Sequence, residues 1–257
     1  MNTHESFLST QWSKVILCNC PAICSLEGLK RILGMKQMMQ NDGQGEGDAL
    51  ENPLCFGMEE LPTAIQQRTH VAGILRRRRK DTTTDNEFES SPLFIHLAHG
   101  LAYTIGSALG STPPSTSVCL SAYLVPNNAG LTAGSRAWAK HSHRSQSRCL
   151  DESESVKQKQ SAGWWGSTSG PVSVINENSL ALFWKVMNAA TWRNLHWLPH
   201  QVLVYEVRVA EGYGMRWSQD RGDHEGDEET SKDDRPWVFR GFVEPYMENG
   251  HEVKWRH

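Results

Sequence analysis

Histidines that could exchange protons are concentrated in the second half of the chain. Most of the eleven histidines, and nine of the ten tryptophans, lie at or beyond position 138. Imidazole titrates near neutral pH, so a histidine can take or give a proton during a reaction. The candidate acid–base residues are His141, His143, His196 and His200. We therefore expect the chemistry of this chain in its second half.

A basic stripe accompanies the first two of these histidines. Arg136, Lys140 and Arg144 recur every four residues in a segment that we expect to be helical. Residues at this spacing share one face of a helix, and such a stripe suits a phosphate or a carboxylate through charge-assisted hydrogen bonds. The same pattern is typical of a solvated helix face, here next to acidic residues at 151–154.

Arginines also lie among aromatic residues and glycines near the end of the chain. Arginine stacks on aromatic rings and binds carboxylates or phosphates through two parallel hydrogen bonds. An aromatic core with Arg–Glu bridges at the strand ends would give the same pattern. The candidate ligand-binding residues are Arg136, Lys140, Arg144, Arg216, Arg240, Glu244 and His251.

The spacing of His196 and His200 resembles a zinc helix only superficially. Pro199 argues against a helix through His200, so we expect a loop whose histidines carry protons, bind a ligand or bond to the backbone. On a continuous helix His141 and His143 point to different sides and cannot share a metal, whereas in an extended segment they could. The cysteines at 18, 20 and 24 lack the second pair typical of structural zinc sites, so no metal and no cofactor is assigned.

Composition narrows the class of protein. The 257 residues carry a formal net charge of −3, which excludes a polycation of the histone kind. No P-loop, GxGxxG, GxSxG or HExxH motif occurs, which disfavours the enzyme classes that these motifs mark. The longest apolar stretch, 92–109, has 11 apolar residues out of 18, too few for a membrane span. We expect a soluble cytoplasmic or nuclear protein with scattered reduced thiols and no membrane partner.

The hydrophobic pattern predicts an α+β fold, with a mixed sheet and packed helices in the C-terminal half and a mainly helical N-terminal part. Residues 1–90 form the N-terminal region, with a flexible linker at 41–53. Residues 91–257 form the α+β domain, with polar insertions at 149–163 and 218–236. The expected helices are 25–40, 62–79, 93–109, 132–148 (capped by Thr132) and 179–193 (capped by Asn176 or Asn178), and the expected strands are 118–125, 172–175, 202–209 and 237–243.

Several short motifs mark the second half of the chain. They are LTAG at 131–134, KHSHR at 140–144, NLHWLPH at 194–200, GYGMRW at 212–217, FRGFVEP at 239–245 and GHE at 250–252. Together they resemble a family of uncharacterised eukaryotic proteins, mostly from plants and algae. The resemblance covers about half of the chain and implies no catalytic residue.

A weaker similarity concerns Leu131, Arg136, His141 and His143. Their order is similar to the Arg-x-His-x-His element of RNA 2′-phosphotransferases of the ADP-ribosyltransferase type. The spacing from the leucine to the arginine is close, whereas the other motifs of that family do not occur in this sequence.

Two functional hypotheses fit these observations. In the first, a pocket at the C-terminal ends of strands 202–209 and 237–243 binds an anionic small molecule, phosphorylated or nucleotide-like, and the histidines serve as acid and base. In the second, the chain is a non-catalytic interaction protein, nuclear or cytoplasmic. Its basic run 76–80 would bind nucleic acid or an import receptor, and the acidic loop 218–236 would dock a partner.

Overall fold

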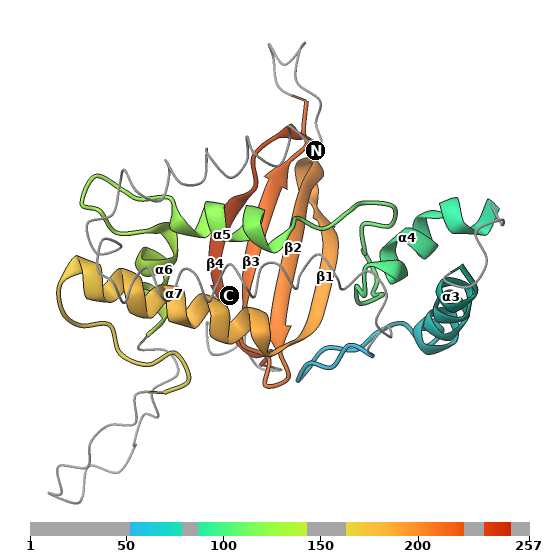
Figure 1. Cartoon of the computed structure of the whole chain (residues 1–257), viewed down its shortest axis with the longest axis horizontal. Helices are drawn as coiled ribbons and strands as arrows, with labels where there is room; N and C mark the ends of the chain where they lie inside the picture. The colour runs from blue at the N-terminus through green and yellow to red at the C-terminus, as the bar shows by residue number, and fades with distance from the viewer. Residues whose placement is uncertain (1–51, 79–86, 143–162, 224–233, 248–257) are drawn as a thin grey trace, which may run out of the picture.

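A four-stranded antiparallel sheet forms the centre of the molecule (Figure 1). The computed structural model describes residues 52–78, 87–142, 163–223 and 234–247. Each strand pairs with the next one along the chain, so the strand order is β1-β2-β3-β4. The strands are β1 (Ala190–Leu198), β2 (Val202–Val209), β3 (Gly214–Asp220) and β4 (Val238–Val243).

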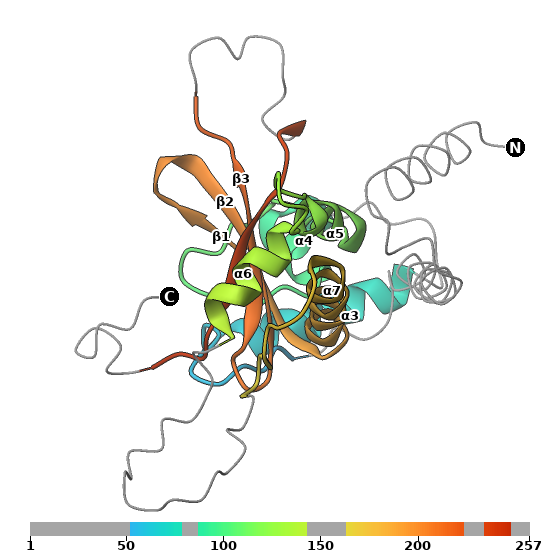
Figure 2. The ribbon, with the colours of Figure 1, turned by 90° about the vertical axis from the view of Figure 1, so that its left-hand side faces the viewer.

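Three helices cover one face of this sheet (Figure 2). They are α5 (Thr116–Leu124), α6 (Ala133–His141) and α7 (Val172–Asn188). Two more helices lie beyond the β1 edge (Figure 1), α3 (Ala64–Arg78) and α4 (Pro92–Ala98). Short 3₁₀ turns occur at Glu87–Ser90 and Pro199–Gln201. The predicted α+β class is confirmed, with all three described strand pairings antiparallel where a mixed sheet was expected.

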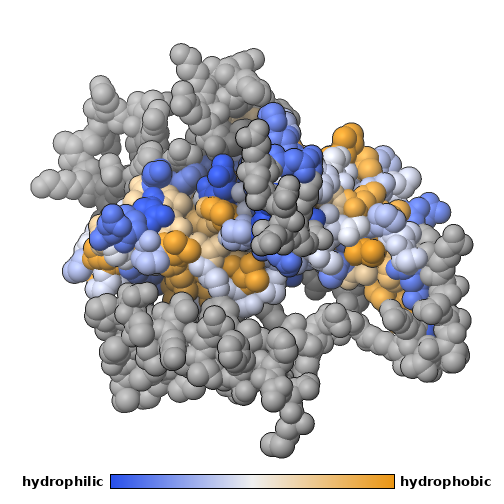
Figure 3. Space-filling model, turned by 90° about the horizontal axis from the view of Figure 1, so that it is seen from above, coloured by the Kyte–Doolittle hydropathy of each residue, from blue (hydrophilic) through white to orange (hydrophobic). Residues whose placement is uncertain are grey.

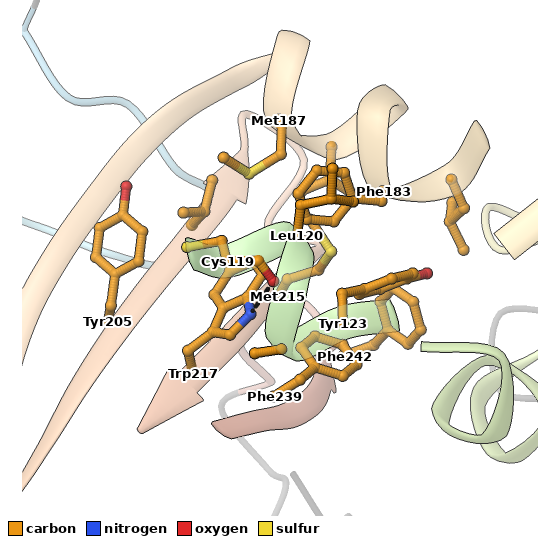
Figure 4. Packing of buried hydrophobic residues seen from close by; sticks show 14 of the residues in the cluster. Cys119, Leu120, Tyr123, Phe183, Met187, Tyr205, Met215, Trp217, Phe239 and Phe242 are labelled. Atoms are coloured by element: carbon orange, nitrogen blue, oxygen red, sulfur yellow. Dashed lines mark hydrogen bonds between the residues drawn. The ribbon is translucent and has the colours of Figure 1, made fainter. Parts of the chain in front are cut away.

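The core lies between the sheet and its three covering helices (Figure 4). Tyr123 from α5 packs against Phe183 from α7 and Phe239 from β4, with ring centroids 5.1 and 4.7 Å apart. The buried indole of Trp217 donates a hydrogen bond to the carbonyl oxygen of Cys119, 3.0 Å away. Burial of aromatic surface of this size is a principal source of stability, so the sheet and helices form one packed unit.

Side-chain caps explain where three of the helices begin. The hydroxyl groups of Ser91, Ser115 and Thr132 accept hydrogen bonds from backbone N–H groups in the first turns of α4, α5 and α6. The predicted cap at Thr132 is therefore confirmed. The predicted cap of α7 at Asn176 or Asn178 is wrong, because that helix already begins after Pro171.

Two predicted strands are wrong and belong to helices. Residues 118–125 alternate in hydropathy, yet 118–124 lie in α5, which starts at the Ser115 cap, and Val125 is its C-cap residue. This helix is apolar around most of its circumference. Residues 172–175 form the first turn of α7, where β-branched side chains stay partly exposed. In both places the apolar run was too short for its period to separate a helix from a strand.

The sheet has two strands that the sequence analysis did not predict, β1 and β3. Strands 202–209 and 237–243 are confirmed as β2 and β4. The helix predicted at 179–193 ends at Asn188, and β1 follows directly. The predicted insertion 218–236 starts inside β3, which runs to Asp220.

The remaining helix predictions have mixed outcomes. The helix expected over 93–109 stops at Ala98, because Gly100 with φ of +67° ends it. Helix 62–79 corresponds to α3, and helix 132–148 to α6 with a shorter described length. The helix predicted at 25–40 and the linker at 41–53, up to residue 51, lie outside the described residues.

The described surface carries scattered apolar groups. On the face seen in Figure 3, hydrophobic residues form separate groups between hydrophilic ones within the coloured part of the chain. None of the helices in the described ranges combines the length and the hydropathy that a transmembrane segment needs.

Candidate functional site

The sheet face turned away from α5, α6 and α7 carries a group of polar side chains. Successive residues of a strand point to opposite faces, and Tyr205, Val207 and Met215 point into the helical core. Their neighbours therefore point the other way. We call this group the polar face; it consists of Asn194, His196, Glu206, Arg208 and Arg216.

Strand register brings the members of the polar face together. Glu206 in the middle of β2 lies opposite Asn194 in β1 and Arg216 in β3. Arg208 is two residues further along β2, on the same side. His196 lies opposite Val204, diagonally across from Glu206, and diagonal neighbours on a sheet are about 7–8 Å apart.

Glu206 is held between two arginines. Its Oε1 accepts from Nε of Arg208 at 2.5 Å, and its Oε2 accepts from Nε and Nη2 of Arg216 at 2.7 and 2.5 Å. Burial alone would raise the pKa of the Glu206 carboxyl, but the charges and hydrogen bonds of the two arginines outweigh it and lower that pKa. Glu206 is therefore a carboxylate at neutral pH.

Because Gly214 has no side chain, the side chain of Arg208 can occupy the space above it. A Cβ at that position would lie 2.7 Å from Cγ of Arg208 and 2.2 Å from the carbonyl oxygen of Val207. With glycine there, the Arg208 side chain crosses β3, and its Nη1 donates to the carbonyl oxygens of Gly212 and Glu244 at 2.6 and 2.8 Å. The guanidinium of Arg208 is thus fixed on three sides.

His196 and Arg216 are the partly exposed members of the group. Burial is the main cause that lowers the pKa of His196; the charge of Glu206 opposes it, and those of Arg216 and Arg208 reinforce it. The imidazole is therefore neutral at pH 7 and can accept a proton. The side chain of Arg216 is 31% exposed, against 4% for Glu206, so an incoming anion meets Arg216.

A loop anchors the β1 side of the polar face. The amide of Asn194 donates to Oγ1 of Thr104 at 3.0 Å and accepts from Oγ of Ser107 at 3.3 Å. Backbone bonds from Ala102 to Arg193 and from Ala108 to Leu195 run along the same edge. Asn194 is therefore held in position by the loop while it faces Glu206.

A second polar cluster lies where α6 meets the end of β4. Nδ1 of His141 is 2.9 Å from Oε1 of Glu244, and Nε1 of Trp165 donates to both carboxylate oxygens at 3.0 Å. The rings of Phe242 and Trp165 flank the imidazole of His141. The structure thus joins two residues that the sequence placed in separate motifs.

The other predicted site residues are distributed over α6, β4 and the turn after β1. Nη1 of Arg136 donates to the carbonyl oxygen of Leu131, and Lys140 is exposed on α6. Arg240 is exposed on β4, and His200 is exposed in the turn after β1 with φ of +64°. His196 itself lies in β1, where a loop was expected. His143, Arg144 and His251 lie outside the described residues.

At the position expected for the pocket, the C-terminal ends of β2 and β4 lie at the same edge of the sheet with β3 between them. The side chain of Arg208 bridges them through its hydrogen bond to the carbonyl oxygen of Glu244. Two surface hollows lie elsewhere, one along α3 and one beside Trp237, and neither is lined by a predicted site residue. Within the described ranges, no three His, Cys, Asp or Glu side chains are arranged to hold a metal ion.

Three members of the polar face were missed by the sequence analysis, namely Asn194, Glu206 and Arg208. A signal for two of them was present: the apolar strand VLVYEVRV carries a Glu and an Arg two residues apart. Charges at that spacing share one face of a strand, and charges in a buried strand are paired. The pairing partner, Arg216, depends on strand β3, which was not predicted.

A comparison with protein families bears on this part of the chain. Residues 124–226 match the model of the CdiA C-terminal tRNase toxin domain. The match covers less than half of the chain and includes β1, β2 and β3, hence every member of the polar face, but ends before Glu244. No curated protein matches the sequence. No solved structure matches it either.

Proposed function

We propose that this chain is a ribonuclease whose active site is the polar face and whose substrate is tRNA or a similarly structured RNA. One observation carries the proposal: a buried carboxylate holds two arginines on a sheet face that also presents a neutral histidine. These are the groups that phosphodiester cleavage needs, namely a proton acceptor and fixed positive charges. The similarity of this segment to a tRNase toxin domain supports RNA as the substrate.

The proposed reaction uses the ribose 2′-hydroxyl as the nucleophile. His196 accepts the 2′-hydroxyl proton while the 2′-oxygen forms a bond to phosphorus. The bond from phosphorus to the 5′-oxygen breaks, and that oxygen takes a proton from water. The hydroxide that remains takes the proton held by His196, which restores the neutral imidazole. The products are a 2′,3′-cyclic phosphate and a 5′-hydroxyl end, so atoms and charges balance.

The arginines and Glu206 have separate roles in this proposal. Arg216, the exposed member, binds the non-bridging phosphate oxygens, on which negative charge grows in the transition state. Arg208 lies behind it and adds positive charge. Glu206 holds both guanidinium groups in place before the substrate arrives, so little reorganisation is needed during the reaction.

The proposal gives the sequence hypothesis a definite ligand. The residue types predicted an anionic small molecule, phosphorylated or nucleotide-like, and histidine acid–base chemistry. An RNA phosphodiester keeps the phosphate and the acid–base chemistry, but the proposed substrate is a macromolecule. The proposal also includes a cytoplasmic or nuclear location, where tRNA is found.

The test is cleavage of purified tRNA by the full chain, with analysis of the product ends. We expect 2′,3′-cyclic phosphate and 5′-hydroxyl ends, and no cleavage of a substrate with a 2′-deoxy sugar at the scissile nucleotide. Cleavage of the deoxy substrate at an equal rate would contradict the 2′-hydroxyl mechanism. Binding of tRNA without any cleavage would favour the non-catalytic hypothesis instead.

A further inference from the structure

We infer that Glu244, with His141, is a positioning residue for the arginines of the polar face. The inference rests on the proposed ribonuclease function and gives both residues a role other than direct contact with substrate. Neither lies on the polar face: His141 ends α6, and Glu244 follows β4. They act through the Glu244 backbone and Arg208.

The Glu244 carboxylate is fixed from two sides. It accepts from the Trp165 indole with both oxygens at 3.0 Å and contacts Nδ1 of His141 at 2.9 Å. The Glu244 side chain is 2% exposed. A buried carboxylate without these partners would be strongly unfavourable, so the three side chains fix the position of residue 244.

The backbone of Glu244, held in place by its side-chain contacts, in turn positions Arg208. Its carbonyl oxygen accepts from Nη1 of Arg208 at 2.8 Å. From there Nε of Arg208 bonds to Glu206, and Glu206 bonds to Arg216. A path thus leads from His141 on the helical side to the partly exposed guanidinium of Arg216 on the polar face. It consists of hydrogen bonds and of the covalent link between the side chain and the backbone of Glu244.

The β2–β3 turn packs closely against the residues that follow β4. A Cβ on Gly212 would lie 3.0 Å from Cα of Pro245, so the β2–β3 turn and the residues after β4 touch along their backbones. Both acceptors of Arg208 Nη1, the carbonyl oxygens of Gly212 and Glu244, come from these two segments. A shift of the segment after β4 would therefore remove an acceptor and move Arg208.

The experiment compares Glu244→Ala, Glu244→Gln and His141→Gln in the full chain, with Val238→Thr as an exposed control on β4. A displacement of about 1 Å away from the reacting groups can cost up to 100-fold in rate. We expect Glu244→Ala to lower kcat for RNA cleavage by roughly 10- to 100-fold, with little change in KM. Glu244→Gln, which keeps shape and an acceptor oxygen, should recover most of the loss. Equal kcat in Glu244→Ala and the control would overturn the inference.

A second readout does not depend on activity. The Nε–Hε signals of Arg208 and Arg216 in ¹H–¹⁵N spectra report their bonds to Glu206. We expect these signals to shift or broaden in Glu244→Ala and His141→Gln, to stay close to those of the wild type in Glu244→Gln, and to stay unchanged in Val238→Thr. Unchanged signals in all variants would overturn the inference. A wild-type chain that leaves RNA intact would instead contradict the proposed function, while these signals would still decide the coupling.

Discussion

At the residue scale, the polar face depends on a balance of buried charges. The carboxylate of Glu206 is almost fully buried and faces the guanidinium groups of Arg208 and Arg216. A buried ion pair is weak as a source of stability but costly to break, because the remaining charge has lost its partner. Glu206 therefore has a structural role in addition to the proposed catalytic one.

We predict that Glu206→Gln destabilises the protein. The two arginines would lose their counter-charge, and breaking a buried pair costs about 3–5 kcal/mol. Urea unfolding followed by circular dichroism would measure the loss. Glu211→Gln, which changes an exposed carboxylate in the β2–β3 turn, is the matched control. Equal unfolding midpoints for the two variants would show that Glu206 is not paired as described.

Two histidines should make stability depend on pH. Burial is the main cause that lowers the pKa values of both His96 and His196 below the ordinary value of 6.5. In the unfolded chain these imidazoles take up protons first as the pH falls. Their neutral forms therefore favour the folded state above pH 6.5, and this contribution is lost as the pH drops toward the folded pKa values.

We therefore expect the free energy of unfolding to decrease between pH 7 and pH 5. His96→Gln keeps a donor for the carbonyl oxygen of Ala102, to which Nε2 of His96 bonds at 2.9 Å, but does not titrate. Combined with His196→Gln, it should flatten the dependence on pH measured by urea unfolding. An unchanged slope in the double variant would mean that other groups cause the effect.

At the element scale, strand β3 completes the site because Gly214 leaves room for Arg208. Gly214→Ala would place a Cβ within 3.0 Å of both β2 backbone and Arg208. Overpacking of this kind costs typically about 1–3 kcal/mol. Gly73→Ala in α3 is the matched control, since nothing lies within 4 Å of its added Cβ, and alanine favours a helix by up to about 1 kcal/mol.

Thermal unfolding of the two variants should therefore give opposite shifts in Tm. Gly214→Ala should unfold at a lower temperature than the wild type, and Gly73→Ala at the same or a higher temperature. A stabilising effect of Gly214→Ala would contradict the close passage of Arg208 over β3.

The elements also show how far the sequence could predict the fold. Strands β2 and β4 are rich in β-branched and aromatic residues, and the Thr132 cap marks α6, so local patterns sufficed for them. Strand β1, ATWRNLHWL, follows α7 after a single residue and carries four charged or polar residues. Its strand conformation comes from pairing with β2, which no local pattern encodes.

At the scale of the whole molecule, the pairing of the strands brings the residues of the proposed site together. His196, Glu206 and Arg216 come from three strands, and only the antiparallel pairing places them on one face. Residue types alone pointed to His196 and Arg216. Glu206 and Arg208 could not be joined to them before β1 and β3 were known, and the pairing of His141 with Glu244 needed the packing of α6 on β4.

The matched segment covers the two clusters to different extents. The polar face lies wholly within the segment similar to a tRNase toxin domain, whereas Glu244 of the second cluster lies beyond it. The helical core between them is continuous from α6 through Phe242 to β3. The molecule thus supports its polar face from the opposite side of the sheet, through the segment that follows β4.

The most direct test of the account is the rate of tRNA cleavage by Arg216→Ala compared with Arg193→Ala. Arg193 is an exposed arginine of β1 whose side chain points to the other face, so it controls for loss of positive charge. Removal of a group that stabilises the transition state costs about 100- to 1,000-fold in kcat. We predict such a loss for Arg216→Ala and wild-type cleavage by Arg193→Ala. Wild-type cleavage by both variants would show that the polar face is not the active site.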